Sequence, residues 1–65
     1  MIHVNGDPSA VAPGTSVRDL LRALDAPDRG VAVAVDGMVV PRGAWAETAL
    51  PDEARVEVVM AVQGG

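Results

Sequence analysis

Apolar and polar residues alternate at the start of the chain in the pattern of a β-strand. Residues 2–5 would place their apolar side chains on one face. The dipeptide Asn5-Gly6 follows, and it is the commonest signal for a type I′ hairpin turn. A second strand is therefore expected over residues 8–12, where Pro8 restricts it to a strand start or to the edge of a sheet.

One helix is expected next, because apolar residues recur at positions i, i+3, i+4 and i+7. These residues form a single stripe that faces a core: Val17, Leu20, Leu21 and Leu24. Either Ser16 or Thr15 caps the start of the helix, and Asp19 stands three residues after Ser16 as in a capping box. Pro27 cannot continue a helix, so residues 25–30 are expected to form the exit loop.

The second half of the chain begins with the pattern of another hairpin. Residues 31–35 alternate valine and alanine, Asp36-Gly37 is a second turn signal, and residues 38–40 return as a short partner strand. Residues 42–50 are expected to be irregular, with room for one short helical turn.

A last strand is expected over residues 55–62, after a polar turn at residues 51–54. The side chains on one of its faces are apolar: Val56, Val58, Met60 and Val62. The other face carries Arg55 and Glu57, but the alternation also places Val59 there. An exposed apolar side chain at such a position is typical of a protein-contact surface.

These elements predict an α+β fold, in which one helix packs across one face of a mixed sheet of four to five strands. The opposite face of the sheet is expected to be solvated. Residues 1–62 would form one domain with one core, and residues 63–65 a flexible tail. The expected core consists of Ile2, Val4, Val17, Leu20, Leu21, Leu24, Val33, Val35, Leu50, Val56, Val58 and Met60.

Composition narrows the function classes. The chain has 65 residues, a formal charge of −4, no Cys and one His, so the sequence offers no cysteine nucleophile, no thiolate metal site and no histidine cluster. An acidic chain without Lys argues against nucleic acid or an anionic membrane as the partner. The apolar runs are too short to span a bilayer, and the start lacks a signal-peptide pattern, so a cytoplasmic location is expected. Trp45, the sole aromatic residue, is expected to plug the edge of the core, and His3 to be a solvated strand residue.

The sequence ends in Gly64-Gly65. Glycine has no Cβ, so a diglycine can pass through a channel too narrow for side chains and present its carboxylate to another protein's active site. The alternative is a frayed terminus, which many domains have. The diglycine therefore indicates a function only in combination with the domain that precedes it.

The whole chain resembles the β-grasp, or ubiquitin-like, fold and more narrowly the ThiS family of sulfur-carrier proteins of thiamine biosynthesis. The similarity lies in these segments: Ile2-His3-Val4-Asn5-Gly6, Gly14-Thr15-Ser16-Val17, Asp19-Leu20-Leu21, Val31-Ala32-Val33-Ala34-Val35-Asp36-Gly37, Val39-Val40-Pro41-Arg42-Gly43-Ala44-Trp45, Asp52-Glu53-Ala54-Arg55-Val56-Glu57 and Gly64-Gly65. The chain departs from the usual family pattern before the last strand, where a Gly-Asp pair is common and Pro51-Asp52-Glu53-Ala54 stands here.

The resemblance implies a carrier that is not itself an enzyme and that binds no cofactor. A ThiF-type adenylyltransferase would use ATP and magnesium to adenylate the Gly65 carboxylate. Sulfur from a cysteine desulfurase or another persulfide protein would then displace AMP and leave a thiocarboxylate, from which thiazole synthase takes the sulfur. Gly64 and Gly65 would enter the partner's active site, and Val59, Ala61 and Gln63 form the candidate partner-docking surface.

Other functions stay open at this point. The same tail chemistry serves the small subunit of molybdopterin synthase, although that family usually carries Phe-rich segments and this chain has no Phe. Sulfur carriers of other pathways, a ubiquitin-like modifier that forms amide bonds and a noncovalent β-grasp interaction module are further alternatives. Deleting Gly65 separates the last of these from a carrier.

Overall fold

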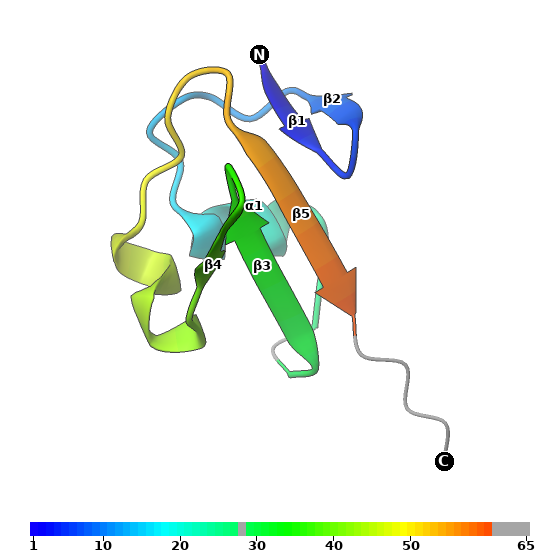
Figure 1. Ribbon diagram of the computed structural model, residues 1–65, viewed down its shortest axis with the longest axis vertical. Helices are drawn as coiled ribbons and strands as arrows, with labels where there is room; N and C mark the ends of the chain where they lie inside the picture. Colours follow the sequence, from blue (N-terminus) through cyan, green and yellow to red (C-terminus); the bar gives the residue numbers. More distant parts are fainter. Residues whose placement is uncertain (28, 61–65) are drawn as a thin grey trace.

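A mixed sheet with a helix across one face forms the body of the protein (Figure 1). The computed structural model describes residues 1–27 and 29–60, and within them the sheet has five strands in the order β2-β1-β5-β3-β4. The elements are β1 (Ile2–Val4), β2 (Asp7–Ser9), α1 (Val17–Ala23), β3 (Val31–Val35), β4 (Met38–Val40), the 3₁₀ helix η1 (Arg42–Glu47) and β5 (Arg55–Met60). Neither helix in this part of the chain has the length and apolar character needed to cross a membrane.

The central strand, β5, joins the two halves of the sheet. It pairs in parallel with β1 and antiparallel with β3, and each of these strands forms an antiparallel hairpin with the strand that follows it. The first and last strands of the chain therefore lie side by side at the centre of the sheet (Figure 1). This arrangement confirms the expected α+β, β-grasp architecture.

Both predicted hairpin turns are present. The φ angles are 51° at Asn5 and 85° at Gly6, and 50° at Asp36 and 85° at Gly37. Two successive positive φ angles are what a type I′ turn requires, and Asn-Gly and Asp-Gly tolerate them best.

The first turn also corrects the expected second strand. A two-residue turn pairs Val4 with Asp7, so the returning strand must begin directly after Gly6. Because β1 has only three residues, β2 ends at Ser9 and does not extend over residues 8–12. Its position at the edge of the sheet agrees with the restriction that Pro8 imposes.

The start of α1 is capped as the sequence indicates. Ser16 is the N-cap residue, and its Oγ accepts a hydrogen bond from the Asp19 N–H at 3.1 Å. The choice between Ser16 and Thr15 is thus settled in favour of Ser16. Val17, Leu20 and Leu21 are buried, which confirms most of the predicted stripe.

Leu24 does not belong to the core, and its side chain is 43% exposed. The helix ends at Ala23, and Asp25 adopts φ 56°. The Ala26 N–H donates to the Leu21 carbonyl at 2.9 Å and the Asp25 N–H to the Arg22 carbonyl at 3.0 Å, which is a Schellman motif. The chain therefore changes direction directly after Leu24, at the end of the helix.

Most of the remaining core agrees with the prediction. The buried residues are Ile2, Val4, Val17, Leu20, Leu21, Val33, Trp45, Leu50, Ala54, Val56 and Val58. Trp45 is 4% exposed, as expected for a core plug, and Val35 is only half-buried. Met60 is 54% exposed and was wrongly assigned to the core. It pairs with Val31 at the end of the sheet, where β3 and β5 extend beyond α1 (Figure 1).

Candidate functional site

The face of the sheet opposite α1 is open to solvent and carries an apolar patch. β5 points Val59 to this face, and the strand register places Ala32 beside it on β3. Ala34 on β3 in turn pairs with Val39 on β4. Val39 and Val59 are 75% and 61% exposed, and together with the two alanines and Glu57 they surround a shallow hollow of about 190 Å³. We refer to Ala32, Ala34, Val39 and Val59 as the apolar patch.

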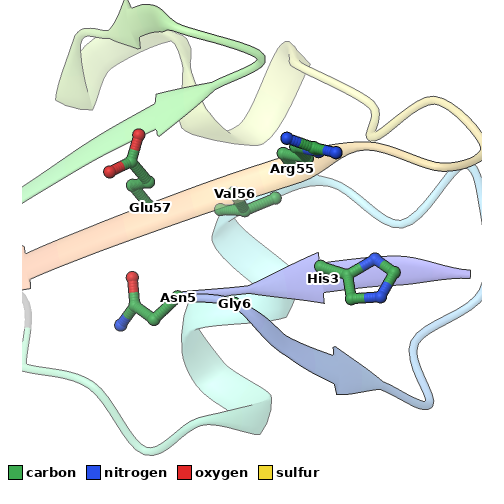
Figure 2. Close-up of a pocket in the computed structure, with 6 residues that line it drawn as sticks. All are labelled: His3, Asn5, Gly6, Arg55, Val56 and Glu57. Atoms are coloured by element: carbon green, nitrogen blue, oxygen red, sulfur yellow. The ribbon is translucent and has the colours of Figure 1, made fainter.

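A larger groove of about 610 Å³, with several polar side chains in its lining, adjoins β1 and β5. Figure 2 shows the residues that line it: His3, Asn5, Gly6, Arg55, Val56 and Glu57. His3 and Arg55 are direct neighbours in the parallel β1–β5 pair. His3 is half-buried here and thus less solvated than expected. The open face is therefore charged on the β1 side of β5 and apolar on the β3–β4 side.

The groove does not have the composition of a metal site. Among residues 1–27 and 29–60, no group of three or more His, Cys, Asp or Glu side chains could hold a metal ion.

The backbone of β5 is held by two hairpin-turn residues, one on each side of the strand. On the β3 side, Asp36 Oδ1 accepts from the Arg55 N–H at 2.9 Å, and the Asp36 N–H donates to the Arg55 carbonyl at 2.8 Å. On the β1 side, Asn5 Oδ1 accepts from the Val58 N–H at 2.8 Å, and Asn5 Nδ2 donates to the Val58 carbonyl at 3.2 Å. Each turn residue thus adds one further pair of hydrogen bonds to the ladder along β5.

The predicted site residues fall into two groups. Val59 lies on the open face, which confirms that it is exposed and excludes a fully covered strand. Ala61, Gln63, Gly64 and Gly65 lie outside the described residues. Their proposed roles stay predictions.

The prediction missed part of the surface around Val59. The position of Val39 could have been found from the Asp36-Gly37 turn, because a two-residue turn pairs Val35 with Met38 and hence Ala34 with Val39. The bonds between Asn5 and Val58 depend on β1 pairing with β5, which no local pattern reveals.

Comparison with known proteins supports the resemblance inferred from the sequence. The model of the ThiS family matches residues 2–65. The sulfur carrier protein ThiS of Escherichia coli is 31% identical over 64 residues, which cover 98% of this chain and 97% of that protein. A thiazole synthase of Magnetococcus marinus is 36% identical over 64 residues, but the chain spans only 20% of its length.

Solved structures agree with the fold. The crystal structure of the thiamine biosynthesis protein ThiS from Geobacter metallireducens superposes with a TM-score of 0.81 at 36% identity, covering 98% of this chain and 97% of that one. A solution structure of a thiamine biosynthesis protein from the same organism gives a TM-score of 0.78 at 37% identity, covering 98% of this chain and 86% of that one.

Proposed function

Because this chain belongs to the ThiS family, and is a sulfur carrier of thiamine biosynthesis rather than an enzyme, we propose that the sulfur is carried on the carboxylate of Gly65. A carboxylate is a poor electrophile, since its negative charge repels nucleophiles and its oxygen is a poor leaving group. Transfer of AMP from ATP to this carboxylate releases pyrophosphate and removes both obstacles. Attack by sulfide on the acyl-adenylate then releases AMP and leaves a thiocarboxylate.

The observation that carries the proposal is the extent of the family match, which includes Gly64 and Gly65. The position of β5 adds support. The described part of this central strand runs to Met60, and Gly65 follows Met60 by five residues in the sequence. Five extended residues span at most about 17 Å, enough to enter a partner's active site while the domain remains outside.

Three partners follow from this chemistry. A ThiF-type adenylyltransferase would bind ATP and magnesium and activate Gly65. A cysteine desulfurase or another persulfide protein would supply the sulfur, which a thiol reductant releases from the persulfide as sulfide while the thiol is oxidised to a disulfide. Thiazole synthase would accept the sulfur from the carrier. This chain is similar to a fifth of the length of a Magnetococcus marinus thiazole synthase, which supports an association of the carrier with thiazole synthase.

We assign the apolar patch to contact with the adenylyltransferase. Val59 lies on the same strand that leads to Gly65, so an enzyme that holds the diglycine in its active site lies close to this face. Val39 and Val59 are exposed large apolar side chains, and burying them against a partner is favourable. Ala61 and Gln63 would extend the same surface toward the diglycine.

Intact mass spectrometry tests the carrier role. The chain is incubated with a ThiF-type adenylyltransferase, ATP, magnesium and sulfide, and the enzyme is first shown to be active on its own carrier. The expected result is a mass gain equal to the exchange of one oxygen for sulfur, dependent on ATP and absent when Gly65 is deleted. The Gly65→Ala variant should keep the wild-type fold and react poorly. An unchanged mass of the wild-type chain would contradict the proposal.

A further inference from the structure

Asn5 and Asp36 occupy equivalent positions in the two hairpins. Each is the first central residue of a type I′ turn, with φ angles of 51° and 50°. Each also directs its side chain to the backbone of β5, at Val58 and Arg55 respectively. They differ in where they hold this strand: Arg55 is its first residue, whereas Val58 lies seven residues before Gly65.

The Asn5 side chain acts as a substitute for a strand. The Asn5 N–H donates to the Val56 carbonyl at 2.8 Å, and this is the last backbone bond from β1 before the chain turns away. The Asn5 side-chain amide then donates to and accepts from Val58, and so supplies both of the hydrogen bonds that a continued strand would supply. Support of β5 on the β1 side is thereby extended from Val56 to Val58.

Among the residues that the structure describes, none belongs to a strand that pairs with this side of β5 beyond Val58. Alternate residues of a strand point their backbone groups to the same side, so Met60 faces the β1 side as Val56 and Val58 do. β1 ends at Val4 and offers Met60 no partner. On the other side, pairing with β3 continues to Met60 through Val31. Without the Asn5 amide, the described backbone of β5 from Val58 onward would be hydrogen-bonded to β3 alone.

We propose that Asn5 is a positioning residue for activation of the C-terminus: its amide fixes Val58 and thereby the direction in which the chain leaves the sheet toward Gly65. This role rests on the proposed function. A fixed strand end lowers the entropy lost when the diglycine is seated in the adenylyltransferase. Asn5 touches neither ATP nor the reacting carboxylate in this mechanism.

The matched variants are Asn5→Gly and Asp36→Gly. Glycine adopts the positive φ angle of both turns without strain, so each variant keeps its turn and loses side-chain hydrogen bonds to β5. Both changes give the unfolded chain the same additional freedom. The two variants therefore differ in which end of β5 is released and in the number of side-chain hydrogen bonds lost, which is two at Val58 and one at Arg55.

The test measures pyrophosphate release by a ThiF-type adenylyltransferase at varied concentrations of the full-length carrier. We expect Asn5→Gly to raise the KM for the carrier about fivefold to thirtyfold, with kcat within about twofold of wild type, because the chemistry at Gly65 is intact once the diglycine is seated. Asp36→Gly should keep both constants within about twofold of wild type. Amide hydrogen exchange should accelerate at Val58 in Asn5→Gly only.

Each other outcome overturns the proposal. Equal KM values for the two variants would show that Asn5 stabilises the fold and nothing more. A wild-type carrier that causes no pyrophosphate release would overturn the proposed function, and with it this role of Asn5. If Asn5→Gly does not fold, Asn5→Asp replaces it. That variant retains the acceptor for the Val58 N–H and loses the donor to the Val58 carbonyl, so a wild-type KM for it would also refute the proposal.

Discussion

The indole N–H of Trp45 donates a hydrogen bond to the main-chain carbonyl of Val40 at 3.0 Å. This bond joins η1 to the end of β4, directly before Pro41 ends the strand. The ring is 4% exposed and packs in the core, so the only aromatic residue of the chain both fills space and satisfies a main-chain acceptor.

Replacing Trp45 separates these two contributions. Trp45→Phe retains an aromatic ring and leaves the Val40 carbonyl without this donor, so we expect a loss of about 1–2 kcal/mol in the free energy of unfolding. Trp45→Ala also leaves a cavity and should cost about 3–5 kcal/mol. Urea denaturation followed by circular dichroism measures both. Equal stability of Trp45→Phe and wild type would show that the hydrogen bond contributes nothing.

The helix cap can be tested by replacing, one at a time, the two residues that the sequence left as alternatives for the cap. Ser16→Ala removes the acceptor of the Asp19 N–H and should cost about 1 kcal/mol, or about 4–8 °C in Tm for a domain of this size. Thr15→Ala is the control and should cost distinctly less. A larger loss of stability for Thr15→Ala than for Ser16→Ala would show that the assignment of the cap to Ser16 is wrong.

Asp25 offers a route to higher stability. It adopts φ 56° at the C-terminal end of α1, in a Schellman motif where glycine is the usual residue. Asp25→Gly should therefore raise the free energy of unfolding by about 0.5–1 kcal/mol, whereas Asp25→Ala should lower it. Urea denaturation of the two variants measures the difference, and equal stabilisation by alanine and glycine would contradict the prediction.

The apolar patch predicts an effect on partner binding without a comparable effect on folding. Val59→Thr keeps the β-branched shape at an exposed position and removes apolar contact, so the KM of the carrier for the adenylyltransferase should rise about fivefold, the equivalent of about 1 kcal/mol.

Met38→Gln is the matched control for that variant. Met38 is 73% exposed. It pairs with Val35, so it belongs to the face of the sheet on which α1 lies and not to the open face. Its substitution should leave the KM unchanged. If both variants raise the KM equally, general loss of exposed apolar surface explains the effect and the patch has no special role.

Local patterns in the sequence determined most of the elements. The two positive-φ turns, the Ser16 cap and the alternation of β3 and β5 each depend on residues within a few positions of one another. Such short-range preferences act in the same way wherever the segment lies in the fold, so they can be inferred from the chain alone. The resemblance to the ThiS family supplied the β-grasp fold and the chemistry expected at Gly65.

Tertiary structure decided which expected core residues are covered and which distant groups meet. Leu24 and Met60 follow the apolar pattern, yet both are exposed, because the helix ends at Ala23 and does not cover the end of β5. Asn5 and Val58 are separated by 53 positions and meet only because β1 pairs in parallel with β5. Contacts of this kind depend on the register between remote strands, which is set by packing of the whole domain and not by either segment alone.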